Sequence, residues 1–462
     1  MKSNRILLFI GTVLLLFAGA CQVIKTHNIR LGTLTLRVPA TGVPDTGTID
    51  PEQLLAQGRY NDTLDNYRQW LDSSRCRFWF PKDDSTFFDP LFAAMEQAAP
   101  SGRHLRVLHY GDSQIEMDRI SDRLRARLQR QFGGGGPGMV PVNTIIPSPA
   151  ISQWGSESLV RMDPYSADST VMRSRGNYGP MIQCFRMYEG ATATFRLGRN
   201  KYSDSLIHQC SHIGLLRHEH SATEARLTVQ GKHHGTLTAS RSQSADGKVV
   251  LQTWQSDSAF SRFSLSIHGN ADIYGVLVDD AAGVAVDNIP MRGCSGQQFI
   301  LVDSILLADA YALLDVGMII LQFGGNSVPY IRHRDKLDTY CHGLAQQIDR
   351  LHGCCPQATI LFIGPSDMST RIGGVTQTYP YLDSIICGLR DTITAHDAAF
   401  WSPYHAMGGK NSMQAWNKKG LAGSDYIHFT QQGADLAGDM LSEAFMTMYR
   451  YYRFRKNNNP CR

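Results

Sequence analysis

Residues 105–114, which read LRVLHYGDSQ, decide the fold prediction. The apolar positions of this stretch stop at Gly111, and the length and flanks of the run predict a buried strand. Apolar residues then recur at helical spacing, at Met117, Ile120, Leu124 and Leu128. We therefore expect a helix to follow the strand almost at once, until the glycine-rich residues 133–138 end it.

After this predicted strand and helix, the pattern of apolar and polar residues changes twice along the chain. Between residues 155 and 286 the strand-like runs are short and alternating, which predicts an inserted all-β sandwich. Strand and helix patterns then alternate, with strands at 318–323 and 359–363 and helices at 304–312, 337–351 and 431–449. This alternation predicts an α/β fold whose parallel sheet carries helices on both faces.

The first residues read as an export signal. Lys2 and Arg5 precede a long apolar run, and small residues lead up to Cys21. Residues 1–24 are therefore predicted to be a signal peptide or a membrane anchor. Cys21 resembles the cysteine that receives the lipid in bacterial lipoproteins. A single membrane helix and a plain cleaved signal remain alternatives. We expect an exported protein of the bacterial periplasm or cell envelope, anchored to the membrane. Polar residues with Gly and Pro make 25–60 a linker without a fold.

Composition excludes several classes of function. The chain of 462 residues is 42% hydrophobic and 19% charged, which is ordinary for a globular protein. The formal charge of +4 is spread over the chain, so nothing indicates binding of nucleic acid. Ten cysteines in an exported chain can include disulfides, but their spacing fits no small stapled scaffold. His218, His220, His233 and His234 lack a matching ligand set, so no metal is expected.

Two motifs carry candidate chemistry. Ser113 follows the predicted strand at its carboxyl end, where active residues of open α/β sheets gather and where backbone N–H groups at a helix start favour negative charge. Asp425 and His428 stand just before the last predicted helix, for which Thr430 is a suitable N-cap. A serine nucleophile needs a base, and the base needs an acceptor that fixes its tautomer. Alone, each motif also fits an ordinary turn or surface loop.

Together these residues resemble the SGNH or GDSL hydrolases. Block one matches residues 111–113, with Gln114 where the family name has Leu; block two resembles 288–293, block three 324–326, and block five matches 425–428. Four blocks in the family's order are far more specific than any one of them. The resemblance implies a flavodoxin-like three-layer α/β/α domain, with a first part at 61–154, the β-sandwich at 155–286 and a second part at 287–455.

The resemblance also assigns roles. It implies that Ser113 is the nucleophile, that His428 is the base and that Asp425 orients the imidazole. The N–H groups of Ser113 and Gly293 and the side-chain amide of Asn326 would form the oxyanion hole, as acyl transfer requires. No metal and no cofactor is implied.

The β insert narrows the likeness further. Its place before block two resembles cell-envelope polysaccharide and peptidoglycan O-acetylesterases, in which a carbohydrate-binding-like β domain interrupts the hydrolase. That implies an acetylated polysaccharide or peptidoglycan as substrate. Trp154, Tyr178 and Tyr274 are then candidates for stacking on sugars, or else core aromatics. An O-acetyltransferase with the same triad and a non-catalytic glycan-binding protein remain alternatives.

Overall fold

The computed structural model describes residues 28–31, 34–37, 64–165, 176–198, 204–231 and 235–458. The chain divides into two units, Met1–Thr48 and Ile49–Arg462. In the first unit, β1 (Asn28–Leu31) and β2 (Leu34–Arg37) pair as an antiparallel hairpin. This corrects the prediction of a linker without a fold for these residues. The predicted signal or anchor at 1–24, with Cys21, lies outside the described residues.

A six-stranded sheet forms the centre of the second unit, in the order β16-β4-β17-β18-β21-β3. Its parallel strands are β4 (His104–Gly111), β16 (Gly283–Pro290), β17 (Val316–Gln322), β18 (Thr359–Ile363) and β21 (Ala399–Trp401). The short edge strand β3 (Phe78–Trp79) runs antiparallel. These strands are buried almost throughout because both faces of the sheet are covered.

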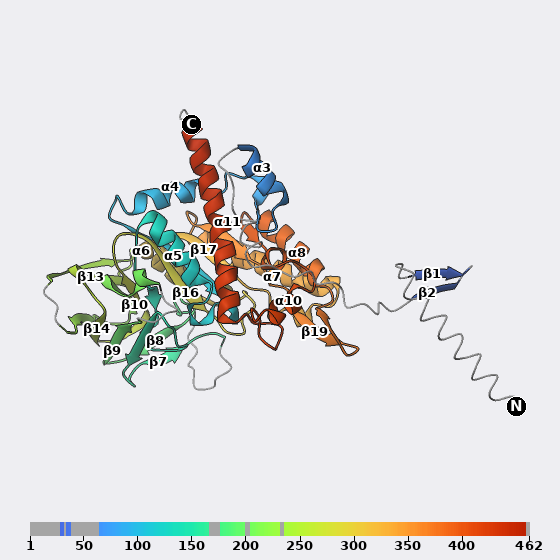
Figure 1. Cartoon of the computed structure of the whole chain (residues 1–462). Helices are drawn as coiled ribbons and strands as arrows, with labels where there is room; N and C mark the ends of the chain where they lie inside the picture. The colour runs from blue at the N-terminus through green and yellow to red at the C-terminus, as the bar shows by residue number, and fades with distance from the viewer. Residues whose placement is uncertain are drawn as a thin grey trace. The chain divides into compact units, whose positions relative to one another are not determined.

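Helices cover the two faces of this sheet and bury a separate core on each side (Figure 1). One core joins the sheet to α3 (Leu64–Ser73), α4 (Asp89–Ala98), α5 (Ser121–Phe132), α10 (Ser412–Lys418) and α11 (Gln431–Asn458). The other joins it to α6 (Ser304–Leu314), α7 (Arg334–Cys354) and α8 (Leu382–Ala395). The predicted three-layer α/β/α fold with a parallel sheet is confirmed.

Two antiparallel sheets form the insert. The larger has the order β12-β13-β10-β15-β8-β7, with β5 paired to β15, and the smaller has the order β11-β14-β9-β6. The bounds are β5 (Gly138–Val140), β6 (Ile151–Gly155), β7 (Val160–Met162), β8 (Cys184–Met187), β9 (Gly190–Leu197), β10 (Cys210–Glu219), β11 (Glu224–Val229), β12 (Leu237–Gln243), β13 (Val249–Phe260), β14 (Arg262–His268) and β15 (Ala271–Asp279). A shared core lies between the two sheets.

The strands of the insert do not keep to residues 155–286. β5 and β6 begin before residue 155, while β16 already belongs to the parallel sheet from Gly283 onward. β5 is only three residues long, between glycines and prolines, so it gives no alternating pattern that a sequence reading could detect. The antiparallel strands therefore run from Gly138 to Asp279.

The larger sheet of the insert packs directly on the α/β layers. Its residues Leu216, Leu251 and Leu277 belong to the same core as α6 and α7. Below this contact the fully buried Arg106 of β4 pairs with Asp279 of β15 and, at 2.7 Å, with Asp287 of β16. Burial opposes the ionisation of Asp279, but the adjacent guanidinium outweighs it and lowers the pKa of that carboxyl. The insert is thus joined to the sheet by apolar packing and by a buried ion pair.

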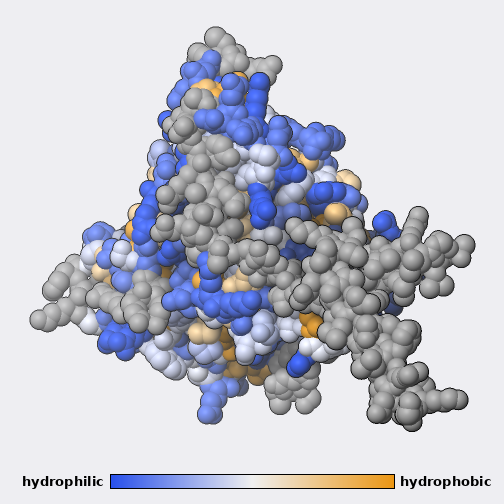
Figure 2. Space-filling model, turned by 45° about the vertical axis from the view of Figure 1, so that its right-hand side comes forward, coloured by the Kyte–Doolittle hydropathy of each residue, from blue (hydrophilic) through white to orange (hydrophobic). Residues whose placement is uncertain are grey.

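The remaining elements are small. The hairpin of β19 (Ser369–Ile372) and β20 (Val375–Thr378) and the short helix α9 (Pro403–Ala406) follow β18 and β21. All eight cysteines of the described ranges are free. Within the same ranges, none of the helices combines the length and the apolar composition needed to span a bilayer. Hydrophilic residues cover most of the described surface visible in Figure 2, and hydrophobic residues form small separate patches.

Candidate active site

The segment that carries Ser113 is a tight turn at the carboxyl end of β4. Asp112 accepts a hydrogen bond from the backbone N–H of Gln114 at 2.9 Å and so caps a short 3₁₀ turn over Ser113–Asp118. Met117 has a φ of 60°, which an α-helix does not allow, and its side chain is 51% exposed. The expected helix therefore does not begin at Ser113, because this turn separates the serine from α5.

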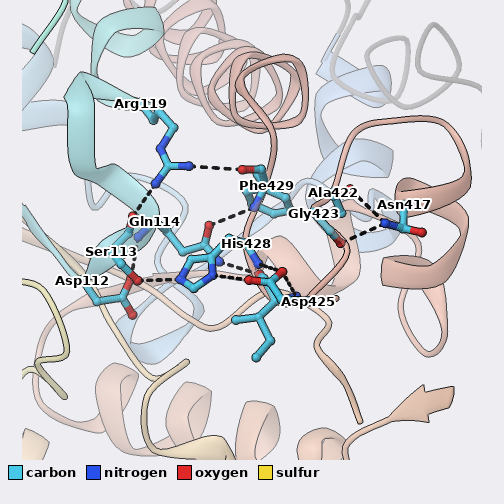
Figure 3. Close-up of polar contacts among 11 residues, drawn as sticks. Asp112, Ser113, Gln114, Arg119, Asn417, Ala422, Gly423, Asp425, His428 and Phe429 are labelled. Atoms are coloured by element: carbon cyan, nitrogen blue, oxygen red, sulfur yellow. Dashed lines mark hydrogen bonds and ion pairs between the residues drawn. The ribbon is translucent and has the colours of Figure 1, made fainter. Parts of the chain in front are cut away.

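Three side chains form a hydrogen-bonded chain at this turn (Figure 3). The Oγ of Ser113 lies 2.8 Å from Nε2 of His428, and Nδ1 of His428 lies 2.7 Å from Oδ2 of Asp425. Ser113 and His428 are 315 positions apart in the chain. A carboxylate at Nδ1 keeps the proton on that nitrogen, so Nε2 is free to accept the proton of the serine hydroxyl. The structure thus brings the three predicted triad residues together.

The loop that carries Asp425 and His428 is held by its own backbone. Oδ1 of Asp425 accepts hydrogen bonds from the N–H groups of Ile427 at 3.0 Å and His428 at 3.1 Å. Burial raises the pKa of Asp425, but the bonds from the His428 ring and from the two N–H groups outweigh it, so the net pKa is lowered. The carboxylate therefore stays ionised when the imidazole gains a proton.

Two residues that sequence reasoning missed join this loop to the nucleophile turn (Figure 3). Nε2 of Gln114 donates to the carbonyl of Ile427 at 2.7 Å, and the N–H of Phe429 donates to Oε1 of Gln114 at 3.4 Å. The guanidinium of Arg119 donates to the carbonyls of Ser113 at 2.6 Å and Phe429 at 3.1 Å. Only the position of Gln114 next to the serine could have drawn attention to it, and nothing in the sequence singles out Arg119.

Asn326 is the predicted oxyanion donor that the structure places beside the serine. Asn326 lines an open cleft of about 200 Å³ together with Ser113 and His428. Nδ2 of Asn326 already donates to the carbonyl of Cys294 at 3.0 Å and to Oδ2 of Asp112 at 3.3 Å. The structure thus brings Asn326 to the serine, and the role of Gly293 stays a prediction.

Asp112 is the buried acid of this site. Only 4% of its surface is exposed, and burial raises its pKa to about 6, although the N–H of Gln114 and the nearby His428 favour the charged form. Its carboxylate accepts a hydrogen bond from the amide of Asn326 at 3.3 Å. Protonation of Asp112 would therefore change the hydrogen bonding of the predicted oxyanion donor.

The aromatic candidates for sugar stacking are mostly core residues. Tyr178 and Tyr274 are buried, so of the two explanations the core one holds for both. Trp154 is 57% exposed on β6 and does not line the cleft. Sequence reasoning missed Tyr330, which lines the cleft and is 78% exposed.

Histidines and aspartates cluster twice outside the cleft. His220 lies 2.9 Å from Asp272, with His218 beside it, but Arg186 already binds both carboxylate oxygens of that aspartate. A second cluster consists of His104, His212 and Asp279, and there the carboxylate is paired with Arg106. His233 and His234 lie outside the described residues. The absence of a metal stays a prediction.

Comparisons with known proteins agree with this fold. No family model and no curated protein matches the chain. A solved peptidoglycan O-acetylesterase is 20% identical over 82% of this chain and 99% of its own, with a TM-score of 0.62. A family two carbohydrate esterase from Cellvibrio japonicus is 10% identical over 65% of this chain and 99% of its own, with a TM-score of 0.26. One from Corynascus thermopiles is 9% identical over 63% of this chain and 99% of its own, with a TM-score of 0.27. Both TM-scores are too low to carry an argument. The chain therefore has the fold of an SGNH-type hydrolase, as its sequence blocks implied.

Proposed function

We propose that the protein is a serine carboxylic ester hydrolase that removes O-acetyl groups from a glycan. The observation that carries this proposal is the hydrogen-bonded chain from Ser113 through His428 to Asp425 at the edge of an open cleft. An isolated serine hydroxyl is a weak nucleophile at neutral pH, and a neutral imidazole oriented by a carboxylate is the arrangement that activates it.

The reaction proceeds through an acetyl-enzyme. Oγ of Ser113 attacks the acetyl carbonyl carbon while Nε2 of His428 takes the hydroxyl proton, and Asp425 stabilises the imidazolium. When the tetrahedral intermediate collapses, His428 returns this proton to the sugar oxygen, which leaves as a free hydroxyl. Water then attacks the acetyl carbon, with His428 again as base, and acetate is released together with the restored Ser113.

The oxyanion hole is the less complete part of the site. We assign the N–H of Ser113 and the amide of Asn326 to it, with the N–H of Gly293 as the third donor that the family resemblance implies. Both N–H groups of Asn326 are already bonded, so the longer bond, 3.3 Å to Asp112, is the one to be exchanged for the oxyanion.

Exposure of the triad favours hydrolysis over transfer to another sugar. About two fifths of the His428 side chain and about half of the Asp425 side chain are accessible to solvent, 41% and 47% respectively. Water can therefore reach the acetyl-enzyme from the His428 side. A transferase has to keep water away from this intermediate until an acceptor hydroxyl binds.

The fold neighbour supports a glycan of the cell envelope as the substrate, because that protein is a peptidoglycan O-acetylesterase. An open cleft with the exposed Tyr330 on its wall suits a sugar chain lying across the serine. The signal-like residues 1–24 further support export to the periplasm or cell envelope, with an anchor in the membrane.

The test is release of acetate from acetylated peptidoglycan and from acetylated xylan, together with cleavage of a simple aryl acetate. Ser113→Ala is expected to lower kcat by about 10⁶-fold. Ser366→Ala is the matched control, because Ser366 lines the same cleft without being part of the triad. Comparable aryl acetate cleavage by the parent and Ser113→Ala would exclude this mechanism, and no cleavage by the parent would favour a non-catalytic glycan-binding protein.

A further inference from the structure

The smaller sheet of the insert has one face turned to solvent. Its other face packs on the larger sheet through Phe195, Phe263 and Leu265, and the larger sheet in turn packs on the α/β layers. β9 and β14 accordingly lie far from α11 in Figure 1. The outer face of this sheet, defined by the outward residues of β6, β9, β14 and β11, is therefore the outermost surface of the insert.

A row of polar residues crosses all four strands of this outer face and begins at an exposed tryptophan. In register, Trp154 pairs with Thr194, Thr194 with Ser264, and Ser264 with Thr228. The indole is 57% exposed at the edge strand. Sugar rings present an apolar face and a rim of hydroxyls, so an indole followed by three hydroxyl side chains matches them chemically.

The next row carries unbalanced charge. Arg196 and Arg262 are directly opposite each other on β9 and β14, and both are exposed. Like charges at directly opposed positions destabilise a sheet. Within the described part of the chain, neither guanidinium has a carboxylate partner. Glu224 is the acidic residue among the outward positions of this sheet, and its carboxylate lies 3.8 Å from Arg226. A bound anion would remove this repulsion and accept hydrogen bonds from both arginines.

The two rows are close enough to contact one sugar residue. Trp154 and Arg196 are diagonal neighbours on β6 and β9, since Ser152 pairs with Arg196 two residues away from Trp154. Diagonal neighbours lie about 7–8 Å apart, within reach of long side chains. The indole of Trp154 on β6 could therefore stack on a sugar ring while the guanidinium of Arg196 on the adjacent β9 binds a carboxylate of the same sugar.

We propose that this outer face binds a polysaccharide that carries carboxylates. Trp154 stacks on a sugar ring, the hydroxyl row contacts the following sugars, and Arg196 with Arg262 holds a carboxylate. This binding goes beyond the proposed esterase activity and needs no turnover. It keeps the polymer attached away from the catalytic cleft and so raises the concentration of acetyl groups near Ser113.

The experiment measures binding of polygalacturonate to the full chain with Ser113→Ala, so that no substrate is consumed. Arg196→Glu is expected to weaken binding by about 10- to 100-fold, because it removes a charge-assisted contact. This variant should still fold, since a glutamate opposite Arg262 replaces repulsion by attraction. Trp154→Ala should weaken binding by about 2- to 10-fold. Neutral dextran of matched length should bind much less, and added salt should weaken the retention of polygalacturonate.

Lys336→Glu is the matched control, because it changes the net charge by the same amount on the exposed surface of α7. It should bind polygalacturonate like the parent. Equal weakening by Lys336→Glu and Arg196→Glu, parent-like binding by Arg196→Glu, or retention on phosphatidylglycerol vesicles in place of polygalacturonate would each overturn the proposal. Because binding is measured without turnover, a failure of the esterase proposal leaves this result unaffected.

Discussion

Replacement of Asp425 by Asn tests the orientation of the imidazole. Oδ1 of Asp425 accepts two backbone N–H groups, from Ile427 and His428, and Oδ2 accepts Nδ1 of the His428 ring. In Asp425→Asn the amide oxygen has to remain at the two N–H donors, because an NH₂ group there would face them. The NH₂ group is therefore forced toward Nδ1, which must become an acceptor, and the ring proton moves to Nε2.

The consequence is a base that holds its proton on the wrong nitrogen. Nε2 of His428, 2.8 Å from Ser113 Oγ, would then donate to the serine rather than accept from it. The corresponding change in serine proteases costs about 10⁴-fold in kcat, which corresponds to about 5.4 kcal/mol of transition-state stabilisation. Folding should change little, because this half-exposed pair is worth about 0–1 kcal/mol.

The assay is kcat for an aryl acetate, with the His428 tautomer read from its ¹⁵N chemical shifts. Asp335→Asn is the control, since Asp335 is an exposed aspartate of α7. The reasoning is refuted if Asp425→Asn keeps kcat within about tenfold of the parent, or if kcat falls while Nδ1 keeps its proton.

Four further predictions concern the surroundings of the triad and the core. Asn326→Ala should lower kcat by about 100- to 1,000-fold with little change in KM, and steady-state kinetics with unchanged kcat would remove it from the oxyanion hole. Gln114→Ala frees the loop of His428, so kcat should fall by about 100-fold; full activity would show that the loop holds itself. Arg106→Leu leaves two carboxylates buried without a cation and should lower the free energy of unfolding by about 3–5 kcal/mol in urea titrations, whereas a loss below about 1 kcal/mol would contradict the buried ion pair. The pKa of Asp112 is raised from 3.8 to about 6, so the folded state keeps the proton of this carboxyl to a higher pH than the unfolded state does. The parent should therefore lose about 3 kcal/mol of stability relative to Asp112→Asn as pH rises from 3.8 to 6. Parallel stability curves for the two proteins over this range would contradict the prediction.

Local patterns account for the elements that the sequence located well. The strand at Thr359–Ile363 was predicted with its observed bounds, because a short apolar run that stops at Gly364 and Pro365 signals a buried strand. α11 begins at Gln431 as predicted, and Thr430 Oγ1 accepts the N–H of Gly433 as an N-cap does. Its end was placed too early, because Tyr451 and Tyr452 continue the buried face beyond residue 449.

Local sequence patterns did not predict the elements whose bounds depend on backbone strain or on contacts with distant residues. The apolar spacing that begins at Met117 indicated a helix, but positive φ values at Met117, Asp118 and Ile120 delay the helix to Ser121. In that turn Arg125 binds Asp118 at 2.6 Å and Arg119 donates to the carbonyl of Phe429, and the apolar spacing predicts neither contact. Tertiary contacts overrode the local preference here.

The sequence by itself determined the layers of the protein and the chemical types at its site. Periodicity distinguishes strands from helices, and the order of the blocks identified Ser113, Asp425 and His428 as the triad. Only the tertiary structure decided that Ser113 and His428 meet at 2.8 Å and that Gln114 joins the two loops. The physical reason is that a hydrogen bond between residues 315 positions apart depends on how the whole sheet is packed, and local sequence preferences carry no information on such a distance.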